Sequence, residues 1–196
     1  ESEVLGLKYD LSRTISKKLS FGAGSEYKYD WGYFDNKGSY EASTKGHSDN
    51  FSMYSNLGWN IFKNSNLSLF GRSDKHKQTG TNNTYKLNYE QGFDNLNLGI
   101  SYMKGLRNPT LYEMFGTDNW GYSGNRNLRP EKSNTYEIYS KIIFNKNLNL
   151  TLRAFRSNIQ NNIEYISNKY QNDSDNVDLN QSGFNNQLNF KLKDTN

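Results

Sequence analysis

Apolar and polar residues alternate along most of the chain. This period of two predicts β-strands whose two faces meet different surroundings. The stretch 19–33 shows the pattern throughout: Leu19 and Phe21 begin an apolar and aromatic series that ends at Tyr33, with small and charged residues between them. Similar stretches occur at 5–11, 51–61, 67–69, 85–93, 96–102, 136–144, 148–154 and 184–192. The chain is therefore predicted to be all-β, with about nine antiparallel strands.

The connections between these strands alternate between short and long. Short links are expected around Arg13, Asn64, Asn95 and Lys146, and long polar loops over 35–49, 73–83, 105–133 and 158–176. In an up-and-down sheet this order places the short turns at one end and the loops at the other, as in an outer-membrane β-barrel. A Greek-key sandwich does not sort its connections in this way. Bacterial barrels have even strand numbers, so an odd count predicts a segment of a larger barrel.

Composition is compatible with a barrel whose interior is polar. Only 33% of the residues are hydrophobic, yet 15% are aromatic, a fraction too high for a disordered chain. The absence of cysteine excludes disulfides and thiolate metal sites. Lysine and arginine are scattered, and the net charge is only +4, so no nucleic-acid partner is expected. No apolar run approaches the roughly 18 residues of a membrane helix.

Two short boxes frame the longest connection, which has strands on both sides. The first is Leu106-Arg107-Asn108-Pro109, followed by Thr110 to Glu113. The second is Asn125-Arg126-Asn127-Leu128, followed by Arg129-Pro130-Glu131. In this order the boxes resemble those of the TonB-dependent outer-membrane receptors, in the style of the vitamin B12 and haem or siderophore branches. The resemblance is firm over 95–165.

The resemblance implies a barrel of about 22 strands with a plugged lumen. It also implies uptake of a scarce nutrient, an iron-siderophore or cobalamin, powered by the TonB complex through the plug, and no enzymatic activity. The expected partners are outer-membrane lipid and a small-molecule ligand. Residues 1–196 are expected to be a partial barrel domain without the plug, the TonB box or the closing C-terminal strand.

The long loop supplies the candidate site residues. Seven residues of the family motifs are expected to frame the loop: Arg107, Pro109, Glu113, Asn127, Leu128, Pro130 and Glu131. All of them except Glu113 and Leu128 are expected to touch no ligand. Four amphipathic or hydrogen-bonding side chains are candidates for ligand contact: Tyr112, Trp120, Tyr122 and Arg126. These four side chains are equally suited to packing the loops against each other.

Metal and haem sites are not favoured. No histidine lies between the two boxes, so haem is not expected as the ligand. The acidic run with Asp173, Asp175 and Asp178 lacks the glycine and terminal glutamate of a calcium loop, and we interpret it as a solvated loop. No metal site is predicted.

Two other classes remain open: a small passive porin-like barrel and a soluble glycan-binding β module. The soluble module predicts that six apolar residues are buried between two sheets, whereas either barrel predicts that they face outward. These residues are Leu19, Phe21, Phe51, Met53, Leu57 and Trp59.

Overall fold

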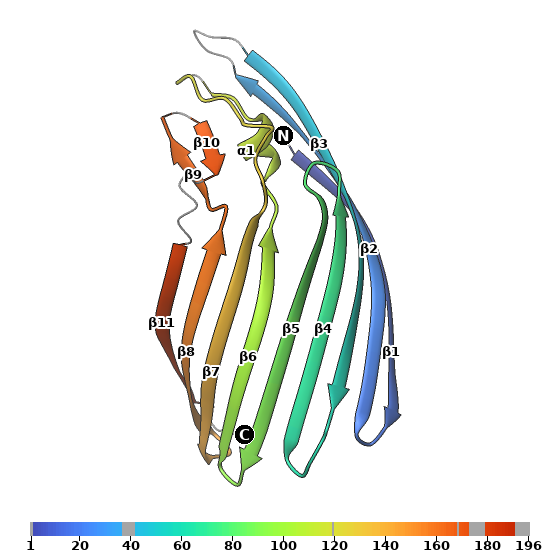
Figure 1. Cartoon of the computed structure of the whole chain (residues 1–196), viewed down its shortest axis with the longest axis vertical. Helices are drawn as coiled ribbons and strands as arrows, with labels where there is room; N and C mark the ends of the chain where they lie inside the picture. Colours follow the sequence, from blue (N-terminus) through green and yellow to red (C-terminus); the bar gives the residue numbers. More distant parts are fainter. Residues whose placement is uncertain (1, 37–41, 119, 168, 173–178, 191–196) are drawn as a thin grey trace, which may run out of the picture.

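In the computed structural model the chain forms one tall, curved antiparallel wall, with loops gathered at one end (Figure 1). The structure describes residues 2–36, 42–118, 120–167, 169–172 and 179–190. The wall is a nine-stranded sheet in the order β1-β2-β3-β4-β5-β6-β7-β8-β11. Each strand pairs with its sequence neighbour, except that β11 pairs with β8 across a small separate hairpin, β9–β10. The expected up-and-down sheet is confirmed.

The strands are long compared with the roughly nine to eleven residues that cross a bilayer at a tilt. Their bounds are β1 Ser2–Ser16, β2 Leu19–Asn36, β3 Ala42–Trp59, β4 Ser65–His76, β5 Gly80–Phe93, β6 Leu96–Arg107, β7 Glu131–Asn145, β8 Leu148–Gln160, β9 Ile163–Ile166, β10 Lys169–Asn172 and β11 Leu179–Phe190. One helical turn, α1 at Leu111–Phe115, lies between β6 and β7. Among the described residues, no helix is long and apolar enough to cross a membrane.

Two of the four expected long loops are largely strand, so that part of the prediction was wrong. The β2–β3 ladder continues to Asn36 opposite Ala42. The β4–β5 ladder continues to His76 opposite Gly80, so only residues 77–79 lie between β4 and β5. At about 3.3 Å per residue, the 18-residue strands β2 and β3 extend well beyond a bilayer core of about 30 Å. Beyond the bilayer no lipid contacts the convex face, so the sequence loses the apolar alternation that marks a strand.

The convex face of the wall is apolar and the concave face is polar. Residues paired across antiparallel strands share a face, and the register places Leu7, Tyr27 and Phe51 in one row. Phe21, Phe51, Met53 and Trp59 are 43%, 44%, 61% and 44% exposed, while Leu19 and Leu57 are intermediate. None of the six test residues is buried. Because the sheet is a single layer, the soluble-sandwich hypothesis is wrong.

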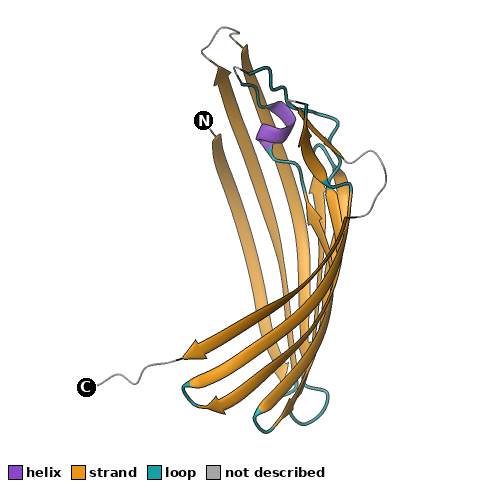
Figure 2. Cartoon of the chain, turned by 90° about the vertical axis from the view of Figure 1, so that its left-hand side faces the viewer, coloured by secondary structure: helices purple, strands orange, loops and turns teal. Residues whose placement is uncertain are grey.

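The concave face contains most of the buried polar side chains. Ser52, Asp74 and Ser157 are nearly inaccessible, because curvature crowds side chains on the inner side of the sheet. Seen from the side, the wall is open on its concave side, and the β6–β7 loop with α1 lies at its upper end (Figure 2).

Candidate functional site

The loop between β6 and β7 begins with a capped helical turn. The Thr110 hydroxyl accepts a hydrogen bond from the Glu113 backbone N–H at 3.2 Å, and the Glu113 carboxylate accepts one from the Thr110 N–H at 2.7 Å. This reciprocal pair is a capping box, which satisfies N–H groups that a short helix leaves unpaired. The Thr-x-x-Glu spacing is a sequence signature of such a cap, and the sequence analysis did not use it.

Arg107 joins three parts of the loop. Its guanidinium donates to both carboxylate oxygens of Glu131, at 2.6 and 2.8 Å, and to Glu113 at 3.1 Å. Glu131 also accepts a hydrogen bond from the Ile163 N–H at 2.8 Å. Hydrogen bonds from the arginine are the main reason why the pKa of Glu131 lies below its ordinary value. The end of β6, the helical turn, the start of β7 and the β9 hairpin are therefore held at one point.

Four tyrosines form a packed cluster above this point. The rings of Tyr112 and Tyr122 stack with centroids 4.9 Å apart, and Tyr122 also contacts Tyr165 at 5.9 Å and Tyr170 at 5.6 Å. The Tyr122 hydroxyl donates to the backbone carbonyl of Tyr112 at 2.6 Å. Only 3% of Tyr122 is exposed, and burial raises the pKa of its phenol.

The β9–β10 hairpin binds the long loop through polar groups. Asn172 accepts a hydrogen bond from the Arg129 N–H at 2.7 Å and donates to the Arg129 carbonyl at 2.9 Å. The Asn125 amide donates to the Tyr170 carbonyl at 3.1 Å. The hairpin and residues 108–130 therefore make one unit, which we call the crown (Figure 1).

The crown lies on the concave side of the wall, where Gly46 leaves room for it. A Cβ on Gly46 of β3 would lie 2.4 Å from the Phe115 ring, whereas one on Gly32 of β2 would be in ordinary van der Waals contact with Leu111, at 3.5 Å. The helical turn accordingly contacts both β2 and β3. Folding over the concave face places the crown at the mouth of the space that the wall partly encloses.

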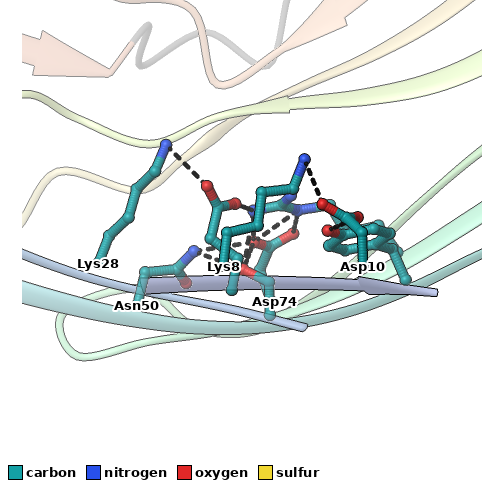
Figure 3. Close-up of polar contacts among 9 residues, drawn as sticks. Lys8, Asp10, Lys28, Asn50 and Asp74 are labelled. Atoms are coloured by element: carbon teal, nitrogen blue, oxygen red, sulfur yellow. Dashed lines mark hydrogen bonds and ion pairs between the residues drawn. The ribbon is translucent and has the colours of Figure 1, made fainter. Parts of the chain in front are cut away.

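Below the crown, the concave face bears a network of ion pairs and hydrogen bonds (Figure 3). Arg72 donates to Asp74 at 3.0 Å, to Glu26 at 2.9 Å and to the Ser52 hydroxyl at 2.8 Å. Asn50 also donates to Asp74, at 2.8 Å. The same region includes the pairs Lys28–Glu26 and Lys8–Asp10. Each of these described acidic and basic side chains has a partner of opposite charge, and the network spans four strands, as expected of a polar inner wall.

Comparison with known proteins identifies this combination of wall and crown. The protein-family model described as TonB dependent receptor-like, beta-barrel matches residues 2–191. The chain belongs to the TonB-dependent receptor family. This family consists of outer-membrane transport receptors and not of enzymes, so the receptor wall lies in the outer membrane.

Solved receptors share the fold at low sequence identity. The siderophore receptor PirA from Acinetobacter baumannii matches with a TM-score of 0.74 at 17% identity, over 98% of this chain and 35% of its own. The ferric-catecholate import receptor Fiu from E. coli K12 gives 0.72 at 17%, over 98% and 36%. The copper transporter OprC gives 0.75 at 15%, over 98% and 36%. The chain thus spans about a third of these receptors. No curated protein matches it.

Among the four candidate contact residues, the structure separates one from the rest. Tyr122 is buried and connects the crown internally, whereas Trp120 is 85% exposed and Tyr112 is 42% exposed. Arg126 is also exposed, with its guanidinium carbon 5.1 Å from the centre of the Phe115 ring. Tyr112, Trp120 and Arg126 are therefore accessible from outside the crown.

The framing residues lie where the loop leaves and rejoins the wall. Arg107 opposes Glu131 in the last pair of the β6–β7 ladder, while Pro109, Leu128 and Pro130 are buried. Glu113 and Asn127 lie inside the loop, and the N–H of Asn127 donates to the Asn125 side chain at 3.0 Å. An exposed ion pair contributes little to stability, but Glu113 is only 8% exposed, so its pair with Arg107 is more than a solvated surface contact.

Two residues of the site were not predicted from the sequence. Tyr165 and Tyr170 complete the aromatic cluster, but they lie in a stretch where apolar and polar residues do not alternate regularly. No group of metal-ligating side chains occurs among the described residues. Asp173, Asp175 and Asp178 fall outside them.

Proposed function

We propose that the full-length receptor imports an iron-siderophore complex and that the crown makes the first contact with it. Support comes from the crown itself, which presents Trp120, Tyr112 and Arg126 at the mouth of the polar inner wall. An exposed indole, phenol and guanidinium on one loop suit a bulky, aromatic and anionic chelate. Two structural neighbours are described as a siderophore receptor and a ferric-catecholate import receptor.

In this proposal transport depends on parts of the receptor beyond the wall described here. As in the family, a plug would fill the lumen and pass energy from the TonB complex, while the wall and crown would select the ligand. Passive porin activity does not fit membership of this receptor family. Cobalamin import is the competing outcome of the test below.

The test measures growth and binding with the full-length receptor. A strain that lacks its own iron and cobalamin receptors would express it and be given single catecholate or hydroxamate siderophores, or cobalamin, as the limiting nutrient. We expect growth on a ferric siderophore. Growth on cobalamin alone, or equal growth without TonB, would overturn the proposal.

The role of the crown is tested separately by Trp120→Ala. Losing a central aromatic contact should weaken ligand binding about tenfold or more. The matched control is Phe62→Ala, since Phe62 is 70% exposed near the short turn between β3 and β4, at the other end of the wall. Equal affinity of the Trp120 variant and the parent would remove the crown from the proposal and leave the import activity standing.

A further inference from the structure

The convex face is hollowed along its strands between β5 and β11. Two adjoining hollows, of about 780 and 450 Å³, share Tyr89, Ile100, Ile138 and Ala154 in their lining. Phe184 lines the larger hollow on the β11 side. We call the two together the lateral groove. Its surface is almost wholly apolar, and the register places most of its lining side chains on the face opposite the polar network.

The groove runs along the strands from Leu87 to Phe93, the last residue of β5 before the short turn. This part of β5 spans roughly 20 Å at about 3.4 Å per residue. The hydrocarbon core of a bilayer is about 30 Å thick, so each leaflet contributes about half of it. The groove therefore has the length and polarity to hold an extended acyl chain.

Cations lie at the crown end of the groove. Arg156 lines the upper hollow, and the register places it in one row with Tyr136 and Tyr102. Lys104 is in the next row toward the crown, with its amine 5.9 Å from the centre of the Tyr85 ring. Tyrosines at this level mark the membrane–water boundary, where long basic side chains reach polar groups.

These cations have no carboxylate partner. The register assigns no aspartate or glutamate to the convex face over the described parts of β4–β8 and β11, whereas Lys75, Lys104, Lys132 and Arg156 all belong to it. Among the described residues, neither Arg156 nor Lys104 forms an ion pair. An unpaired cation beside hydrocarbon is costly, and an anionic group from outside the protein would relieve that cost.

We propose that the lateral groove is a binding site for a phosphate-bearing lipid of the leaflet on the crown side. One acyl chain lies along the groove past Ile100, Ile138 and Ala154. The lipid phosphate is bound by Arg156 and Lys104 at the level of the tyrosine row. Such a lipid would stabilise the part of the wall to which the crown is attached. The site is independent of the imported ligand.

Native mass spectrometry of the full-length receptor in detergent tests the site. Phosphatidic acid and phosphatidylcholine with identical acyl chains serve as probes. We expect preferential retention of phosphatidic acid, reduced about fivefold for each cation removed by Arg156→Gln and Lys104→Gln. Ala154→Trp, which fills the groove, should weaken both lipids. Heat-dependent gel migration verifies that each variant remains folded.

Lys75→Gln is the matched control, because Lys75 is on the same face but lines neither hollow. It should retain phosphatidic acid as the parent does. The proposal is overturned by equal retention of both lipids in the parent, by full retention in the double variant, or by an equal loss in the control. Displacement by equimolar inorganic phosphate would also overturn it, since that would indicate an anion site without a lipid.

Discussion

Replacing Arg107 with alanine should open the crown while leaving the wall intact. The substitution removes both bonds to Glu131 and leaves Glu113, a carboxylate that is 8% exposed, with no other described partner than the Thr110 N–H of its helix cap. Leaving a buried charged acceptor without a partner costs about 1–3 kcal/mol, whereas an exposed ion pair is worth at most about 1 kcal/mol. Arg107 is partly exposed, so we expect about 2 kcal/mol in local stability.

Hydrogen exchange of the full-length receptor measures this effect directly. A loss of about 2 kcal/mol corresponds to roughly 30-fold faster exchange, since each 1.4 kcal/mol is a factor of ten. The acceleration should appear in 108–130 and 163–172 and be absent from the ladder of β2 and β3. Arg129→Ala is the control, because among the described residues the hydrogen bonds of Arg129 use only its backbone N–H and carbonyl. Unchanged exchange in the Arg107 variant, or equal acceleration in the control, would refute the reasoning.

Three further perturbations test other parts of the same frame. Tyr122→Phe removes one hydrogen bond to α1, worth about 1 kcal/mol, so crown amides should exchange about fivefold faster; no change would mean that the ring packing alone holds the loop. The pKa of Glu131 lies below its ordinary value near 4.5, so its stabilising effect is present above that value and lost as the pH falls through the lowered one. Protease cleavage of the crown should therefore rise in the parent as the pH falls below 4.5, and Glu131→Gln should flatten that rise. Gly46→Ala would place a methyl group against Phe115, so we expect a loss of about 1–3 kcal/mol by hydrogen exchange near α1, whereas the control Gly71→Ala meets nothing within 4 Å and should have little effect.

The sequence predicted the wall well because the wall depends on one property, namely which surroundings each face of a strand meets. A residue on the convex face meets lipid and its neighbour meets the polar interior, so the alternation of Phe51 and Met53 with Ser52 reports the fold directly. The turn at Asp94–Asn95 was also predicted correctly, and Asp94 has the positive φ of 37° that such a turn requires. The pattern failed where strands continue beyond the membrane, as in 42–50, because no lipid contacts the convex face there.

The crown was much less predictable, since its contacts join residues far apart in the chain. Tyr122 packs on Tyr165 and Tyr170, and Asn172 bonds to Arg129, but nothing in the local sequence relates these positions. The burial of Glu113 likewise depends on how the loop folds back over Arg107. Only the capping box at Thr110 had a local signal.

The crown combines a fixed frame with a variable surface, and these depend on different residues. Its attachment uses the last pair of the β6–β7 ladder, Arg107 opposite Glu131, and the buried ring of Tyr122. Trp120, by contrast, is 85% exposed. The backbone N–H groups of Trp120 and Tyr122 both donate to the Asp118 carboxylate, and these bonds do not involve the indole. Under the proposed function, we expect substitutions of the exposed indole to change what the crown binds, whereas substitutions of Arg107 should loosen its attachment. A receptor built in this way can acquire a new ligand by changing exposed side chains, while the wall and the hydrogen bonds of Arg107 to Glu131 and Glu113 stay as they are.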